Sequence, residues 1–232
     1  MAPDKRQQKL ERKAAKRKAK QKAARSGAQT LGRKALLRKA ATWPVMECWI
    51  NEAWEDPMQL NQLVLARRNP NTGEVIMASY LVDRACLGVK NAMVGRFEDA
   101  QEFRTEFLQG VQARQEMMRT DEHHVAAVIK AGLDYATNLK FRPHRDYAEA
   151  AIMLGDADPA VFTEPIPVGG TEGKPFFVSG PYDNPDKIMA HLNRLLGAEG
   201  FHYMAAIDPE TGGWLSEEDD GWLEIDEDEA IE

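Results

Sequence analysis

The fold is decided by the stretch QLVLARRNPNTGEVIMASYLVD, residues 62–83. Its two ends are runs of apolar residues rich in Val, Leu, Ile and Tyr, many of which favour strands. Between them, residues 69–73 (NPNTG) combine Asn, Pro and Gly within the length of a hairpin loop. The stretch therefore predicts two antiparallel strands, residues 62–68 and 74–83, joined by a turn.

The segments on either side extend this hairpin into an α+β fold. Upstream, residues 45–50 (VMECWI) predict another strand and hence an antiparallel β-meander of three strands. Downstream, a second hairpin is predicted for residues 162–168 and 174–179 around 169–173 (GGTEG), and a last strand for residues 203–207. Apolar residues at helical spacing predict helices over residues 98–118 and 145–154. Two further helices are predicted after the caps Asp121 and Asn184, the second ending at Gly197. The helix after Asp121 has one apolar face, formed by Val125, Val128, Ile129, Leu133 and Ala136. The order of these elements favours an α+β domain, a β-meander and hairpins packed with several helices, over a doubly wound sheet.

The N-terminal arm carries most of the charge asymmetry of the chain. Residues 1–39 contain fifteen Lys or Arg and two acidic residues, a net charge of +13. Residues 5–24 are mostly strong helix formers without an apolar stripe, so we expect them to be helical or disordered, and residues 30–41 to form a second short basic helix. Such an arm is typical of proteins that bind a polyanion, because Lys and Arg neutralise phosphates and release counterions. The candidate nucleic-acid-binding residues are Lys5, Arg6, Lys9, Arg12, Lys13, Lys16, Arg17, Lys18, Lys20, Lys22, Arg25, Arg33, Lys34, Arg38 and Lys39.

The C-terminal tail has the opposite charge. Residues 208–232 contain twelve Asp or Glu and no Lys or Arg. Trp214 and Trp222, each followed by Leu, interrupt the acidic residues. We expect a solvated tail, which as an alternative could dock on a protein partner or fold back on the arm. The predicted organisation is a basic arm (1–42), an α+β domain (43–207) and an acidic tail (208–232).

Several classes of protein are not expected. No run of eighteen apolar residues occurs, and the charged N-terminus has no apolar core of a secretory signal, so we expect no membrane partner. The two cysteines are too few for a disulfide framework or a Cys-based zinc site, which favours a reducing cytoplasm. His123 and His124 are adjacent and would point about 100° apart on a helix, so they favour no metal site. No phosphate-binding loop or other cofactor motif is present, and no cofactor is expected.

A thiol enzyme is the main alternative to a binding protein. In residues 81–90 (LVDRACLGVK), an apolar strand ends in a turn that carries Cys86. If a helix began there, the thiol would have a lowered pKa and could act as a nucleophile. His144 and Asp146, in residues 141–147 (FRPHRDY), could then complete a Cys/His/Asp set for a hydrolase or transferase. The structural alternative is a buried Cys86 beside a structural glycine, with His144 capping a helix.

The same two motifs resemble those of a group of uncharacterised bacterial proteins, in which a strand ends in LVD-x-x-CLGVK and a later helix is followed by F-x-PH-x-D. The resemblance covers residues 60–150. It implies that Asp83, Cys86, Lys90, His144 and Asp146 form a common surface, and it implies no activity. The sequence therefore predicts a non-enzymatic bacterial accessory factor that binds RNA or the ribosome through its arm. The alternatives are a thiol enzyme using Cys86, His144 and Asp146, or a protein-interaction module using the acidic tail.

Overall fold

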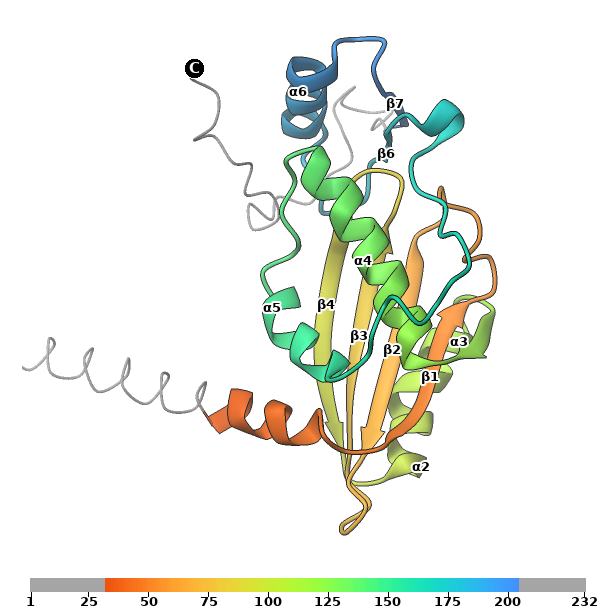
Figure 1. Ribbon diagram of the computed structural model, residues 1–232, viewed down its shortest axis with the longest axis vertical. Coiled ribbons are helices and arrows are strands. Elements are labelled where there is room, and N and C mark those ends of the chain that lie inside the picture. Colours follow the sequence, from red (N-terminus) through yellow and green to blue (C-terminus); the bar gives the residue numbers. More distant parts are fainter. Residues whose placement is uncertain (1–31, 205–232) are drawn as a thin grey trace, which may run out of the picture. The chain divides into compact units, whose positions relative to one another are not determined.

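The computed structural model describes residues 32–204 (Figure 1). The chain divides into two units, Met1–Lys39 and Ala40–Glu232. Residues 32–40 are helical, which confirms the predicted second basic helix within the described part of the chain. None of the helices in residues 32–204 is long and apolar enough to cross a membrane.

The domain is built on a five-stranded antiparallel sheet with the order β4-β3-β2-β1-β5. The predicted meander is confirmed as β1, β2 and β3, and the sequence analysis missed β4 and β5. In the turn between β2 and β3, the side-chain oxygen of Asn69 accepts a hydrogen bond from the backbone N–H of Asn71, and Gly73 adopts a φ of +84°. The strands are β1 (Val45–Asn51), β2 (Asn61–Arg68), β3 (Val75–Asp83), β4 (Gly88–Phe97) and β5 (Met117–Thr120).

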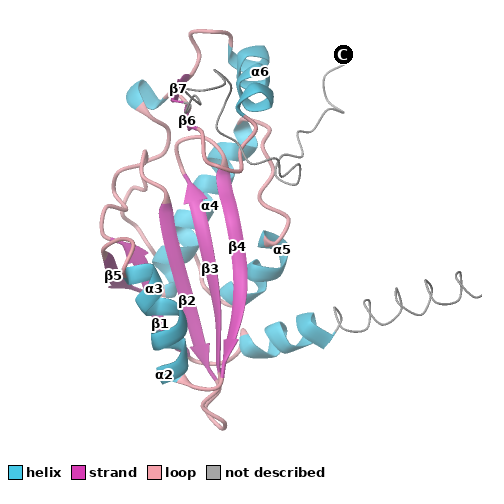
Figure 2. Cartoon of the chain, turned by 180° about the vertical axis from the view of Figure 1, so that it is seen from behind, coloured by secondary structure: helices cyan, strands magenta, loops and turns pink. Residues whose placement is uncertain are grey.

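Helices cover both faces of this sheet (Figures 1 and 2), and because the sheet is antiparallel the fold is α+β. The long helix α4 (Glu122–Asn138) crosses one face and contacts β1 to β4, and α5 (Tyr147–Ala150) lies against β3 and β4. On the opposite face, α2 (Ala100–Glu102), η1 (Phe103–Leu108) and α3 (Gln109–Gln112) form one continuous helical segment. This segment buries Phe103 and Leu108 against Val64, Ala66, Val75 and Met77.

The helix boundaries follow the predicted caps. The carboxylate of Asp121 accepts hydrogen bonds from two backbone N–H groups at the start of α4. The side-chain oxygen of Asn184 accepts one hydrogen bond, from the backbone N–H of Lys187, at the start of α6 (Pro185–Leu196), which ends at Gly197. The predicted helix 145–154 is found as α5 followed by the short helix η2 (Ala151–Leu154), ending at Gly155.

Two predictions were wrong because long-range pairing overrides local pattern. The predicted helix 98–118 ends at residue 112, and Met118 lies in β5, which pairs with β1. The predicted second hairpin does not form: residues 162–168 contain no strand, and residues 171–173 form the short helix η3 (Thr171–Gly173). Strand β6 (Phe176–Val178) pairs in parallel with β7 (His202–Met204). Residues 205–207 of the predicted last strand, like the acidic tail, lie outside the described residues.

Close packing between α4 and the sheet requires a glycine at position 132. A Cβ atom on Gly132 would lie 2.5 Å from Cγ1 of Val82. We therefore predict that Gly132→Ala lowers the free energy of unfolding by about 1–3 kcal/mol, measured by urea denaturation, although Ala normally favours a helix. Gly110 in α3 is the control, because a Cβ atom there would meet nothing within 4 Å. Gly110→Ala should be neutral or stabilising by up to about 1 kcal/mol, and equal effects at the two positions would contradict the packing argument.

Candidate nucleic-acid interface and the predicted thiol site

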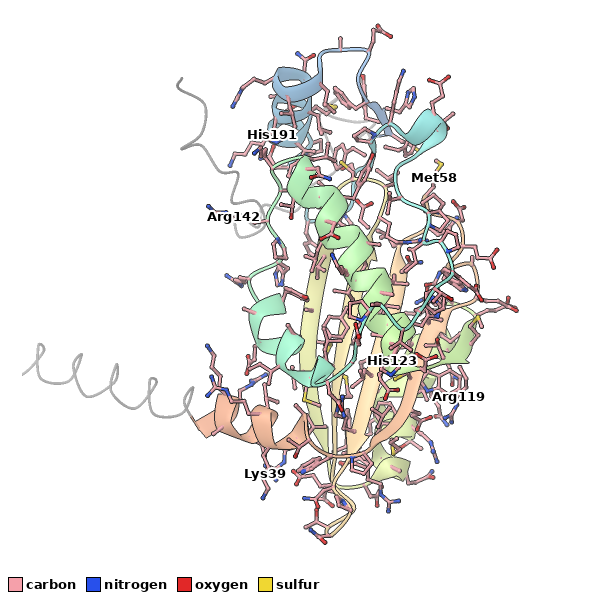
Figure 3. The ribbon with its side chains drawn as sticks, viewed as in Figure 1. Lys39, Met58, Arg119, His123, Arg142 and His191 are labelled. Atoms are coloured by element: carbon pink, nitrogen blue, oxygen red, sulfur yellow. The ribbon has the colours of Figure 1, made fainter. Side chains whose placement is uncertain are left out.

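The described part of the basic arm presents its cations to solvent. Arg33, Lys34, Arg38 and Lys39 are all exposed on the helix formed by residues 32–40, and Figure 3 shows the side chain of Lys39. Lys34 and Arg38 are four residues apart and so lie on the same side of that helix. The other candidate cations, Lys5 to Arg25, lie outside the described residues.

Cys86 lies in a turn between two strands, which corrects the expectation that a helix begins there. The carboxylate of Asp83 accepts hydrogen bonds from the backbone N–H groups of Ala85, Cys86 and Leu87, at 2.9 to 3.1 Å. These bonds shape the turn that connects β3 to β4. A helix N-terminus would have lowered the pKa of the Cys86 thiol, but the carboxylate of Asp83 lies at this turn instead.

The surroundings of Cys86 are those of a structural thiol. The residue is fully buried in an apolar cluster with Leu87, Phe141, Phe177 and Ile188. Burial, with a smaller contribution from the charge of Asp83, raises its pKa well above the ordinary value. This shift is the reverse of the one that a nucleophilic thiol needs.

His144 and Asp146 follow α4 in the segment that leads to α5. The backbone N–H of His144 donates to the carbonyl oxygen of Val89 at 2.9 Å, so the two sequence motifs lie beside each other. The side chain of His144 is buried, whereas that of Asp146 is 58% exposed, with 3.9 Å between Nδ1 and Oδ2. Asp146 directly precedes α5 and His144 lies two residues earlier, so the cap position falls on Asp146 rather than on His144.

The remaining polar residues of the first motif stabilise the interior rather than a common surface. Nζ of Lys90 lies 2.5 Å from Oδ2 of Asp183, and both side chains are almost fully buried. Burial raises the pKa of Asp83, while the charge of Lys90 and the three backbone N–H groups oppose this shift. Asp83, Cys86 and His144 are also buried, so the surface implied by the resemblance is not formed.

Two buried arginines, which the sequence analysis did not single out, hold irregular segments on the sheet. The side chain of Arg84 donates to the carbonyl oxygens of Trp54, Asp56 and Pro167 and to Oδ1 of Asn61. The sequence signal for both arginines is a cation within or directly after an apolar strand: Arg67 in VLARR and Arg84 in LVDR. Such a cation, when it faces the core, must find polar partners.

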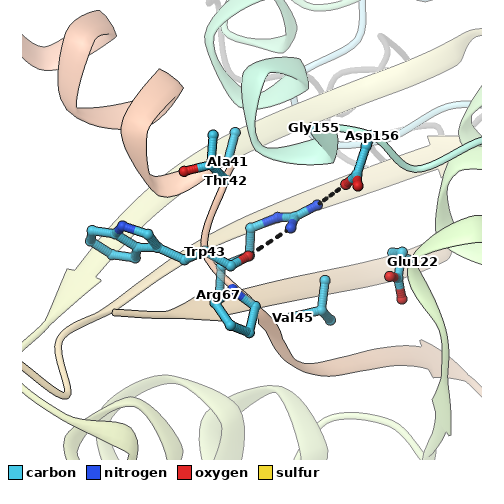
Figure 4. A pocket seen from close by; sticks show the side chains of 9 residues that line it. Ala41, Thr42, Trp43, Val45, Arg67, Glu122, Gly155 and Asp156 are labelled. Carbon is cyan, nitrogen blue, oxygen red and sulfur yellow. Dashed lines mark hydrogen bonds and ion pairs between the residues drawn. The ribbon is translucent and has the colours of Figure 1, made fainter. Parts of the chain in front are cut away.

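Arg67 forms a wall of a pocket of about 620 Å³ (Figure 4). Its guanidinium donates to the carbonyl oxygens of Trp43, Met153 and Leu154 at 2.8 to 3.0 Å. One carboxylate oxygen of the exposed Asp156 lies 3.5 Å from Nη2. These bonds join the start of β1 to the end of η2. The pocket is lined by Ala41, Thr42, Trp43, Pro44, Val45, Arg67, Glu122, Gly155 and Asp156.

The histidines of the domain serve packing. The ring of His124 stacks on that of Phe162, with 3.9 Å between the ring centroids. Burial lowers the pKa of His124. His191 is buried, with Nε2 2.8 Å from the carbonyl oxygen of Leu139. Within residues 32–204, no three His, Cys, Asp or Glu side chains are grouped to hold a metal ion.

Arg67 offers a direct test of its structural role. We predict that Arg67→Met lowers the free energy of unfolding by about 3 kcal/mol, because the carbonyl groups of Trp43 and Met153 lose a buried donor and that of Leu154 keeps only the N–H of Ala157. Arg68 is the matched control, since it is the next residue of β2 and its side chain is exposed. Arg68→Met should change stability by less than about 0.5 kcal/mol, and an equal loss in both variants would refute the role.

Both thiols should resist alkylation in the native chain. Burial raises the pKa of Cys48 to about 12 and that of Cys86 well above its ordinary value, so each stays protonated until the pH exceeds its pKa. Iodoacetamide should therefore label two thiols in urea and none in the native chain between about pH 7 and 9. A native labelling midpoint near 8.5, roughly the value for an ordinary thiol, would show an accessible cysteine. Because the thiols ionise more readily in the unfolded chain, stability should also fall as the pH rises above about 8.5.

Comparisons of this chain with protein-family models, with curated proteins and with solved structures found no match. The roles of its residues therefore follow from geometry. On that basis the motif around Cys86 shapes and anchors the turn between β3 and β4.

Proposed function

We propose that this protein is a non-enzymatic accessory factor that binds RNA, free or within the ribosome, through its basic N-terminal arm. The main observation that supports this proposal is the segregation of charge along the chain. Residues 1–39 hold half of the thirty Lys and Arg residues and only two of the thirty-seven acidic residues. On the described helix, Arg33, Lys34, Arg38 and Lys39 are exposed. Cations concentrated in this way attract a phosphate backbone strongly at low salt, and without sequence preference.

The features of the domain support binding rather than thiol chemistry. Cys86, the predicted nucleophile, is fully buried and its pKa is raised by burial. Two free, buried cysteines are also compatible with a reducing cytoplasm, where we place the protein. The arm contains no Phe, Tyr or Trp, so base stacking would contribute little and phosphate contacts would dominate.

Removing the charge of the described helix should weaken RNA binding. In the full chain, we predict that replacing Arg33, Lys34, Arg38 and Lys39 with Gln lowers affinity for a single-stranded RNA, measured by fluorescence anisotropy across salt concentrations. Gln is nearly as good a helix former as Lys and Arg, so the helix should persist. The slope of log K against log salt should shrink by up to about 3, since each phosphate contact contributes roughly 0.7.

The control removes the same number of charges from the folded domain. Arg114, Lys130, Lys187 and Arg194 are exposed and lie on different segments. Their replacement with Gln should leave the salt slope nearly unchanged. An affinity of the unaltered chain weaker than micromolar at about 50 mM salt, or equal losses in the two variants, would refute the proposed function.

A further inference from the structure

Strand β7 has one open edge in the described part of the chain. It pairs in parallel with β6, and these two strands form a sheet of their own (Figure 1). The N–H of His202 donates to the carbonyl oxygen of Pro175. The carbonyl oxygen of Met204 accepts a hydrogen bond from the N–H of Ser179. Because successive residues of a strand direct their backbone groups to opposite sides, the N–H and carbonyl group of Tyr203 point away from β6 and are open to a further strand.

The side chains of β7 make this open edge apolar. Met204 is 62% exposed and Tyr203 is 56% exposed, which are among the largest exposed fractions of the large apolar side chains in residues 32–204. Val178, the partner of Met204 in β6, is exposed as well. The open backbone edge and the side chains of Tyr203 and Met204 together are named the β7 edge. Such an edge is a template for an added strand, and proteins usually cover it or place charges on it.

The sequence that follows β7 resembles the turn between β2 and β3. Residues 69–73 (NPNTG) and residues 208–212 (DPETG) both place Pro, Thr and Gly at the same spacing after an Asn or an Asp. In the first of these segments, the Asn side chain accepts a hydrogen bond from the backbone N–H two residues later, and the Gly has a φ of +84°. An Asp supplies the same kind of acceptor as an Asn. The sequence of residues 208–212 therefore predicts a second turn that reverses the chain.

The residues after this predicted turn have the composition of a cover for the β7 edge. The tail lies outside the described residues, but its sequence places Trp214 and Leu215 directly after the turn and acidic residues at 217–220. Adjacent residues of a strand point to opposite faces, so Tyr203 and Met204 lie on opposite faces of β7. A strand that contains Trp214 and Leu215 supplies one apolar side chain for each face. The acidic residues that follow would charge the new edge and prevent further pairing.

We propose that the β7 edge binds the start of the chain's own tail, residues 213–218, as an added antiparallel strand. The segment is tethered to β7 by a short turn, which gives it a high effective concentration at this edge. Trp214 and Leu215 then belong to the folded domain and are not available to dock on another protein. The contact is independent of the proposed RNA binding.

The test follows hydrogen exchange of the backbone N–H of Tyr203 by NMR in the full chain. If the tail pairs with the β7 edge, this N–H should exchange at least about tenfold more slowly than in an unstructured peptide. Replacing Trp214 and Leu215 with Ala should remove most of this protection, because the added strand loses its apolar contacts. The matched control replaces Trp222 and Leu223 with Ala and should leave the protection unchanged.

Three results would overturn the proposal. The first is exchange of the Tyr203 N–H at the peptide rate in the unaltered chain, and the second is an equal loss of protection in the two double variants. The third is protection that rises with protein concentration, which would show a second copy of the chain at the β7 edge in place of the tail. Amides of β2 and β3, followed in the same spectra, should stay protected in every variant because the main sheet is unchanged.

Discussion

The folded domain depends on two buried guanidinium groups. Arg67 joins the entry of β1 to the end of η2, and Arg84 joins residues 54–56 to Pro167. Both are satisfied mainly by backbone carbonyl oxygens of segments that have no place in the main sheet. A buried cation without such partners would be very costly, so each arginine and its partner segments require one another. The irregular segments are therefore held against the sheet by hydrogen bonds to these two side chains.

The need to pair buried polar groups also explains why the motif at residues 81–90, which suggested catalysis, is structural. In LVDRACLGVK, Asp83 caps the turn, Arg84 holds two distant loops, Cys86 fills the core and Lys90 pairs with Asp183. Gly88, with φ of +71°, allows the close approach of β4 to α4. Each polar residue of the motif has an intramolecular partner, which removes the main reason to assign it a reaction.

Local signals predicted the elements that depend on local chemistry. The turn at residues 69–73, the caps Asp121 and Asn184 and the helix end at Gly197 were all predicted, because each acts within a few residues. Strand β5 and the parallel pair β6–β7 were missed, since their partners lie far away in sequence. The exposure of Arg142 and Arg145 beside a buried His144 was likewise hidden, because only the contact with Val89 decides which side chains of this segment face inward.

The most direct test of RNA binding through the arm is to locate the contacts themselves. Ultraviolet cross-linking of the full chain to RNA, followed by mass spectrometry, identifies the peptides that touch the nucleic acid. If the arm binds RNA, the cross-linked peptides come from residues 1–40. Cross-links confined to the β-sheet and α4, or absent while the protein is saturated with RNA, would contradict it.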